Sequence, residues 1–226
     1  MEMAKNTDRR LYEKTPHHFD FLTYRLGTGR IIPSFKIDYK KSELTEYNEA
    51  ISEQVTELVA HYQFLENLPI TNDLLSAPTG YIGSRRTVIE QVQQAMMQLA
   101  TFHSYHDVQF VPVFREEELP LWEWSRWLPH MKLQQFNCRS FVYHQRSRDQ
   151  LLTSLYQMIK ERKQAAEQAG SNKQLTFTPH YVFVITDLSL MLDHNIMEFI
   201  NEDLSHLGIS YLFVEDVIES LPEHVN

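Results

Sequence analysis

The chain has 226 residues, of which 42% are hydrophobic and 23% are charged, the composition of an ordinary globular protein. Six residues are glycine, whereas a typical usage near 7% would give about 16. A dinucleotide fingerprint needs three glycines within six residues, and a phosphate loop needs two glycines followed by lysine. No stretch supplies either set in full, which excludes a standard nucleotide-binding loop.

The charge is unevenly distributed along the chain. Asp and Glu outnumber Lys and Arg by 30 to 21, a net charge of -9, and residues 174–226 carry nine acids with no Lys or Arg. Phosphate backbones require clustered cations, so a nucleic-acid binder is excluded. The acidic C-terminal segment is either a solvated face or a docking surface for a basic partner.

Three further features limit where the protein can act. Cys138 is the single cysteine, which excludes a disulfide framework and favours a reducing compartment. No apolar run approaches the ~20 residues needed to cross a bilayer. The polar start of the chain differs from a signal peptide and is typical of the end of a charged helix, so we expect a segment of a longer protein.

Taken in chain order, the first elements are short. Residues 3–14 predict the end of a helix. Residues 21–27 and 31–38 predict two strands around a hairpin turn at Gly27-Thr28-Gly29.

Residues 43–65 predict a longer helix with one buried face. Its apolar residues recur every three or four positions, namely Ala50, Ile51, Val55, Leu58, Val59 and Tyr62. A polar loop containing Pro69 and Pro78 is expected to follow.

From residue 80 onward, apolar strands alternate with helices. The expected strands are residues 80–83, 107–114, 141–143, 181–186 and 209–214. The expected helices are residues 84–103, 148–168 and 192–207, the last ended by Gly208. We therefore predict an α/β fold of three layers, with a mostly parallel sheet, helices on both faces and a P-loop or Rossmann-like nucleotidase topology.

The junction after residues 80–83 is where a phosphate loop would lie. Counted from Gly80, the consensus asks for Gly-Lys-Ser/Thr at the positions of Arg85, Arg86 and Thr87, so Gly80 and Thr87 alone agree. Two apolar strand residues already follow Gly80. The sequence therefore predicts a contracted loop, in which the strand runs into a helix capped by Ser84.

Two arginines in the first helical turn keep an anion site open as an alternative. The helix macrodipole disfavours cations there, and an acid partner or a bound anion would relieve this. The candidate residues of a degenerate nucleotide or anion site are Gly83, Ser84, Arg85, Arg86, Thr87 and Asp187. Asp187 ends an apolar strand as a Mg²⁺-holding acid does, but Leu188 stands where a second acid would orient water.

Other chemistry-bearing patterns are weak. The 11 histidines form no HExxH set and no GxSxG elbow occurs, so we expect no metal site and no catalytic residue. Three tryptophans fall within six residues, and they lead to a fourth interface candidate: Trp122, Trp124, Trp127 and His130. These residues are either a binding platform or a buried group beneath the sheet edge, and both hold if another domain packs there.

Several strings are familiar together. GYIGSRRTVIEQVQQAMMQLATFHS, DVQFVPVF, WEWSRWLPH, YVFVITD and HLGISYLFVEDVIESLP follow one another, after FDFLTYRLGTGRIIPSF and HYQFLENLP. The series resembles the membrane-proximal cytoplasmic domain of the EssC/EccC coupling proteins of type VII secretion, in their firmicute form. Those proteins are FtsK/SpoIIIE-like ATPases of Gram-positive bacteria. The resemblance covers nearly the whole chain.

The resemblance implies an ATPase-like α/β domain over residues 41–226, after a helix and hairpin extension over residues 1–40. Transmembrane segments would precede it and ATPase domains would follow it. The implied function is a pseudo-ATPase module, degenerate at its phosphate loop, that links the membrane anchor to those ATPase domains and supports export of WXG-type proteins. The implied location is the cytoplasmic side of the bacterial membrane, with other type VII membrane components as partners and a hexamer of the full-length ATPase.

Two alternatives stay open beside this reading. The domain could still bind ATP and Mg²⁺, through Arg85, Arg86, Thr87 and Asp187, and regulate the motor. It could instead be a docking module for a secreted substrate or for another secretion-system protein.

Overall fold

The computed structural model describes residues 10–35, 49–169, 175–217, 221–222 and 225. The chain divides into two compact units. Unit 1 comprises Met1–Tyr24 with Asp73–Asn226, and unit 2 is Arg25–Asn72. This division differs from the predicted boundary at residue 40, because residues 25–72 form a unit of their own.

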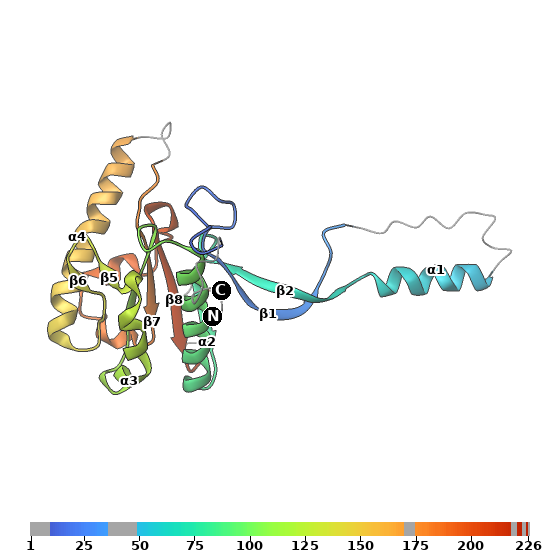
Figure 1. The fold of residues 1–226 in the computed structure, drawn as a ribbon, viewed down its shortest axis with the longest axis horizontal. Coiled ribbons are helices and arrows are strands. Elements are labelled where there is room, and N and C mark those ends of the chain that lie inside the picture. The colour runs from blue at the N-terminus through green and yellow to red at the C-terminus, as the bar shows by residue number, and fades with distance from the viewer. Residues whose placement is uncertain (1–9, 36–48, 170–174, 218–220, 223–224, 226) are drawn as a thin grey trace. The chain divides into compact units, whose positions relative to one another are not determined.

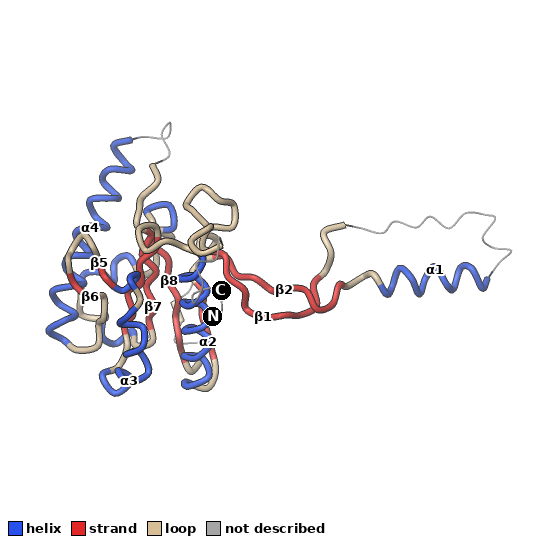
Figure 2. Tube along the Cα trace, in the orientation of Figure 1, coloured by secondary structure: helices blue, strands red, loops and turns tan. Residues whose placement is uncertain are grey.

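A four-stranded parallel sheet is the centre of unit 1 (Figures 1 and 2). Its strand order is β3 (Thr79–Ile82), β8 (Ile209–Glu215), β7 (His180–Ile185) and β4 (Val108–Val113), with every neighbouring pair parallel. Every residue of β4 and β7 is buried, as the continuous apolar runs predict. These four predicted strands are confirmed.

Two helices cover opposite faces of this sheet (Figure 1). Along β7, Val182 and Val184 face α2 (Arg85–Phe102) in one apolar cluster, whereas Phe183 and Ile185 face α4 (Gln145–Ala169) in another. Alternate residues of a strand point to opposite faces, so one strand contributes to both cores. The predicted three-layer α/β fold is confirmed.

The segments between these elements depart from the sequence-based expectations. The predicted strand at residues 141–143 is reduced to a single bridge between Val113 and Val142. Short elements that the sequence did not predict precede it: α3 (Leu119–Trp122), β5 (Lys132–Leu133) and β6 (Cys138–Arg139).

The helix predicted over residues 192–207 is wrong, since the segment folds into 3-10 turns at Asn195–Phe199 and Ser205–Leu207. Local side-chain bonds compete with the helix: His194 Nδ1 accepts from the Ile196 amide, and Asp203 Oδ1 accepts from the Ser205 amide. Gly208 ends the last turn, as predicted, and its backbone is in the left-handed conformation.

Unit 2 holds parts of a separate two-stranded sheet, β1 (Thr23–Ile31) paired with β2 (Leu65–Asp73), and the helix α1 (Glu49–His61). The predicted turn at Gly27-Thr28-Gly29 is wrong, because β1 runs straight through it and pairs with a segment expected to be a loop. Gly29 lies against the Ile70 side chain of β2, and a Cβ at Gly29 would force the Ile70 side chain to shift.

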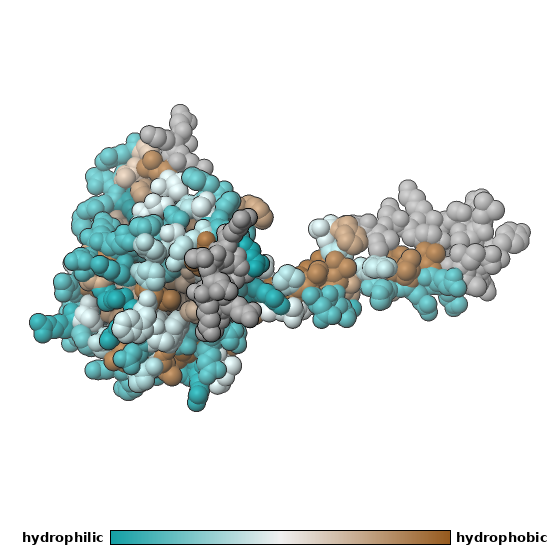
Figure 3. Space-filling model, viewed as in Figure 1, coloured by the Kyte–Doolittle hydropathy of each residue, from teal (hydrophilic) through white to brown (hydrophobic). Residues whose placement is uncertain are grey.

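The apolar side chains of unit 2 remain largely at its surface (Figure 3). Leu58 of α1 is 56% exposed and Tyr62 is 45% exposed, so the expected burial of this helix face is wrong for its described residues. Residues 43–48 of that prediction lie outside the described residues. The predicted helix at residues 3–14 also lies partly outside them, and its described part, from Arg10, forms a turn and a bridge at Lys14.

Candidate functional site

The carboxyl ends of the parallel strands meet at one edge of the unit 1 sheet. Gly83 follows β3, Arg115 follows β4, Asp187 follows β7, and Glu215 ends β8. Ligands of open α/β sheets bind outside this edge, so the candidate nucleotide residues lie where such a site would be.

The connection from β3 to α2 is two residues long, Gly83 and Ser84. Gly83 has φ +150°, a conformation that residues with a side chain rarely adopt. Ser84 occupies the N-cap position as predicted, but its side chain makes no capping hydrogen bond and its Oγ lies 3.4 Å from Thr87 Oγ1. A two-residue connection is too short to wrap a triphosphate with the eight-residue phosphate-loop motif.

Arg85 forms an ion pair with a carboxylate from the segment after β4. Its Nε lies 2.7 Å from Glu118 Oε1, with the two side chains 23% and 12% exposed. Glu118 Oε2 also accepts a 3.2 Å hydrogen bond from Thr186 Oγ1, at the end of β7. The Glu118 carboxylate therefore offsets the unfavourable position of the Arg85 cation at the start of α2. The sequence had allowed either an acid partner or a bound anion for this role.

The other candidate residues do not converge on this point. Arg86 is exposed and pairs with Glu90, one turn along α2, at 3.2 Å. Thr87 is also exposed. Asp187 Oδ1 accepts hydrogen bonds from the amide and the hydroxyl of Ser189, at 3.1 and 2.6 Å, so this carboxylate caps a 3-10 turn.

Acids outnumber cations among the charged groups at this edge. Burial raises the pKa of Glu215, and the charges of Asp216 and Asp187 raise it further, while Arg85 opposes the shift. Arg115 Nε stands 3.7 Å from Asp187 Oδ2. The local charge therefore disfavours a polyphosphate.

Acids of the C-terminal segment pair with cations from earlier in the chain. Besides Asp187 with Arg115, two pairs form across α4: Asp193 with Arg148 at 2.6 Å, and Glu202 with Lys163 at 2.7 Å. Part of the acidic segment is thus neutralised within the fold, which leaves less of it for a basic partner.

The four interface candidates have different environments. Trp122 is fully buried and stacks on Phe114, with ring centroids 5.3 Å apart. Trp124 is partly buried, whereas Trp127 is 82% exposed. Burial lowers the pKa of His130, whose Nε2 donates to the His103 carbonyl at 2.8 Å. Of the four, Trp127 presents most of its side chain to solvent.

Sequence reasoning missed Glu118. The misplaced cation at Arg85 indicated an acid partner, but three consecutive acids follow β4, and the sequence does not distinguish Glu118 from Glu116 or Glu117. Within the described residues, no group of three or more His, Cys, Asp or Glu side chains is arranged to bind a metal ion. In the same residues, no helix combines the length and the apolar character needed to span a membrane.

Comparison with curated proteins finds relatives at 53% and at 35% sequence identity. No protein-family model matches the chain. The type VII secretion system protein EssC of Staphylococcus aureus (strain NCTC 8325 / PS 47) is 53% identical over 218 residues, covering 96% of this chain and 15% of that protein. The ESX secretion system protein EccC of Geobacillus thermodenitrificans (strain NG80-2) is 35% identical, covering 96% of this chain and 14% of that protein. The chain thus spans about 15% of the length of the curated relatives it matches.

Two solved structures are similar in fold. The cytoplasmic domain of EssC aligns with a TM-score of 0.51 at 14% identity, covering 70% of this chain and 32% of that one. ATPases 2 and 3 of EssC from Geobacillus thermodenitrificans align with a TM-score of 0.52 at 13% identity, covering 96% of this chain and 37% of that one. At such identities the likeness is evidence for the fold alone.

Proposed function

Since the chain belongs, over 96% of its length, to the EssC/EccC family of type VII secretion proteins, we propose that it is a non-catalytic, ATPase-like module of the secretion motor. Membership confirms the resemblance noted in the sequence. The observation that carries the proposal is the Arg85–Glu118 pair, which stands at the helix start where a nucleotidase would bind phosphate.

Three features of this edge support the loss of nucleotide binding. The two-residue connection leaves no loop to surround a phosphate chain. The Arg85 guanidinium donates through Nε to Glu118, and that carboxylate repels a phosphate beside it, while the buried Arg85 Nη2 has no hydrogen-bond partner within the described residues. Asp187 is held by Ser189 and has Leu188 beside it, which leaves no adjacent acid to orient water.

In this proposal the module has a structural role and catalyses no reaction. In this proposal it links the membrane anchor to the downstream ATPase domains of the same protein, on the cytoplasmic side of the bacterial membrane. Its partners would be those domains and other type VII membrane components, in a hexamer of the full-length ATPase that exports WXG-type proteins. The parallel sheet needs no catalytic loop to remain folded, because burial of apolar residues on both faces stabilises it.

A thermal-shift experiment with Mg-ATP tests this proposal. A ligand that binds only the folded state raises the melting temperature, by an amount that grows with its concentration. We expect no saturable shift at millimolar Mg-ATP. A saturable shift that disappears in Arg86→Ala would favour a regulatory ATP-binding domain instead.

One observation favours a docking module as the second candidate. Trp127 is 82% exposed and Leu121 is 42% exposed, both in the segment that follows β4. Large exposed aromatic residues are enriched at binding hot spots. Pull-down of WXG-type proteins or motor domains at low and high salt, with Trp127→Ala compared with Phe19→Ala, tests it. Equal retention by both variants would argue against docking through Trp127.

A further inference from the structure

Three exposed cations gather beside the exposed Trp127 in unit 1. Arg126 precedes Trp127 in the 3-10 turn Glu123–Trp127, whereas Lys132 and Arg139 belong to the short strands β5 and β6. Arg139 Nη1 donates to the Arg126 carbonyl, which holds the β5–β6 hairpin against this turn. We call Arg126, Trp127, Lys132 and Arg139 the cation–tryptophan surface.

The hairpin places two of these cations directly opposite each other. Lys132 pairs with Arg139, and Leu133 pairs with Cys138, in antiparallel register. Leu133 is buried, so the alternation of side chains along a strand leaves Lys132 and Arg139 on the solvent side of the hairpin. Like charges directly opposite each other destabilise a strand pair, and an anionic partner would remove that cost.

The three cations have no carboxylate partner in the part of the chain that the structure describes. The ion pairs there involve other cations, among them Arg148 with Asp193 and Lys163 with Glu202. Glu123 lies three residues before Arg126 but forms no ion pair with it. In a chain with a net charge of -9, this surface is therefore a local concentration of positive charge.

The turn that carries Trp127 is anchored to the core on both sides. Trp122 stacks on Phe114, and the buried Ser125 Oγ donates to the Trp122 carbonyl at 2.7 Å. After the turn, the Met131 carbonyl accepts from the amide and the hydroxyl of the buried Ser140, at 3.0 and 3.1 Å. The exposed groups thus stand on a fixed framework, which reduces the entropy lost when a partner binds.

We propose that the cation–tryptophan surface docks an acidic peptide segment of a partner protein. The carboxylates of that segment would meet the three cations, and a bulky apolar side chain beside them would cover Trp127. Trp and Arg are the residues most enriched at binding hot spots, and complementary charge selects the partner. This proposal rests on the docking role raised for Trp127 and names the chemistry of its partner. It does not depend on the loss of nucleotide binding at the carboxyl edge.

A long polyanion fits this surface less well than a short acidic segment. Nucleic acids and anionic membranes extend their charge well beyond three cations. They would meet the exposed Glu116, Glu117 and Glu123, which belong to the same connection between β4 and β5. Repulsion from these acids favours a partner whose negative charge is confined to a few residues.

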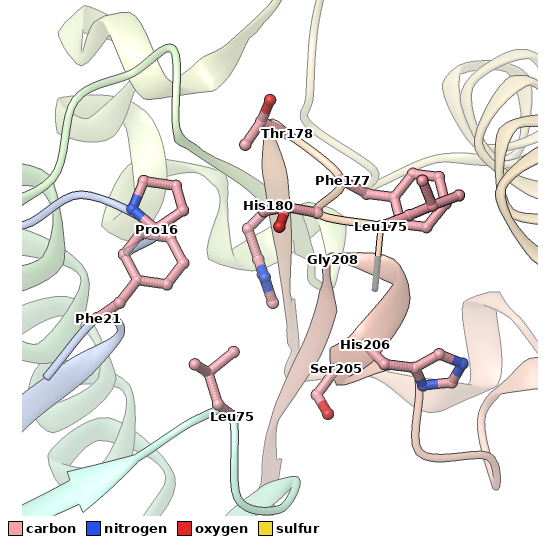
Figure 4. A pocket seen from close by; sticks show the side chains of 11 residues that line it. Pro16, Phe21, Leu75, Leu175, Phe177, Thr178, His180, Ser205, His206 and Gly208 are labelled. Atoms are coloured by element: carbon pink, nitrogen blue, oxygen red, sulfur yellow. The ribbon is translucent and has the colours of Figure 1, made fainter. Parts of the chain in front are cut away.

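The cavity around His180 offers no competing site for such a segment. It has a volume of about 310 Å³ and lies where β7 and β8 begin (Figure 4). No lysine or arginine lines it. An acidic probe is therefore expected to bind at the cation–tryptophan surface rather than in this cavity.

Matched peptides test the proposal on the whole chain. The first has two Asp-Glu-Leu repeats, the second has two Asn-Gln-Leu repeats and lacks the charge, and the third has two Asp-Glu-Ser repeats and lacks the apolar group. Binding is followed in NMR titrations by the three tryptophan indole N–H signals. With the first peptide we expect a saturable shift of the Trp127 signal and little change for the buried Trp122.

The matched peptides should bind more weakly. Each exposed ion pair contributes roughly a factor of 1.4 to 5, so the uncharged peptide should bind about tenfold more weakly than the first. The serine peptide should bind roughly fivefold more weakly, since it lacks an apolar side chain to cover the indole. High salt should weaken the first peptide and leave the uncharged one nearly unchanged.

Substitutions locate the binding. Lys132→Gln and Arg139→Gln should each weaken the first peptide roughly threefold, and Trp127→Ala should weaken it roughly fivefold. Lys160→Gln removes an exposed cation of α4, and Phe19→Ala removes an exposed aromatic ring, so both controls should keep the affinity. Lys132→Gln should also raise the melting temperature slightly, because it relieves the repulsion from Arg139.

Four results would overturn the proposal. These are no saturable binding of the first peptide, equal binding of its uncharged counterpart, equal affinity in Lys132→Gln and Lys160→Gln, and tighter binding of a thymidine oligonucleotide or a phosphatidylserine vesicle to the same residues. The pull-down of motor domains separates this failure from that of the docking role. If the partner chemistry alone is wrong, Trp127→Ala still reduces the pull-down, whereas if docking itself fails, the pull-down is unchanged as well.

Discussion

The Arg85–Glu118 pair should stabilise the fold far more than its neighbour on the same helix, the Arg86–Glu90 pair. The first has side chains 23% and 12% exposed at 2.7 Å, and the second has side chains 84% and 58% exposed at 3.2 Å. At an effective dielectric constant near 20, two unit charges about 4 Å apart attract by about 4 kcal/mol. Solvent reaches part of both side chains and screens this attraction, so we expect a coupling of about 2 kcal/mol.

Two double-mutant cycles measure this difference. Arg85→Gln and Glu118→Gln form the first cycle, and Arg86→Gln and Glu90→Gln form the control cycle. Urea unfolding followed by tryptophan fluorescence gives the free energy of each variant. We expect a coupling of about 0.3–0.5 kcal/mol for the exposed pair, and a further decrease of it at high salt. A coupling for Arg85–Glu118 no larger than that of the control would refute the structural role assigned to the pair.

Three further predictions concern single positions. Burial lowers the pKa of His103 to about 4, against about 6.5 when unfolded, so its contribution to stability is full above the unfolded value and is lost as pH falls toward the folded value. Between about pH 7.5 and about pH 5, His103 alone should lower the free energy of unfolding by about 2 kcal/mol. His103→Gln should flatten this part of the pH profile measured by urea unfolding, whereas the control His106→Gln should leave it unchanged. Equal profiles for the two variants would contradict this assignment to His103. Gly83→Ala should destabilise by about 2 kcal/mol because of φ +150°, whereas Gly27→Ala, with nothing within 4 Å of its Cβ, should change stability little; similar melting temperatures for the two variants would count against strain at Gly83. Trp122→Ala should lower the free energy of unfolding by about 4 kcal/mol because it leaves a cavity, whereas Trp127→Ala, at a side chain 82% exposed, should lower it by less than about 0.5 kcal/mol. Similar losses for the two variants in chemical denaturation would contradict the burial of Trp122.

The sequence predicted the elements whose identity depends on local pattern. β4, β7 and β8 are continuous apolar runs, and the face of α2 repeats at helical spacing, so the central sheet and its first covering helix were predictable. β2 was missed because it contains Pro69 and several polar residues, and its pairing with β1 depends on a contact distant in sequence. The turns after β7 were missed for a different reason, because local side-chain hydrogen bonds to His194 and Asp203 compete with the helical ones that the apolar spacing suggested.

The sequence predicted where the candidate site lies, but not which side chain pairs with Arg85. The contracted junction at Gly83 and Ser84 follows from the sequence, as does the need for an anion or an acid near Arg85. Which acid meets Arg85 depends on the 3-10 turn Glu116–Glu118, whose geometry no local pattern specifies. The cavity around His180 has no sequence signature, because its lining comes from segments that only the fold brings together.

Calorimetric titration of Mg-ATP into the chain tests the central claim most directly. We expect no saturable heat for the unmodified chain, because Glu118 already pairs with Arg85 and the connection from β3 to α2 is two residues long. Saturable binding at one site per chain, weakened by Arg86→Ala and absent for Mg-free adenosine, would contradict the account and establish the carboxyl edge as a working nucleotide site.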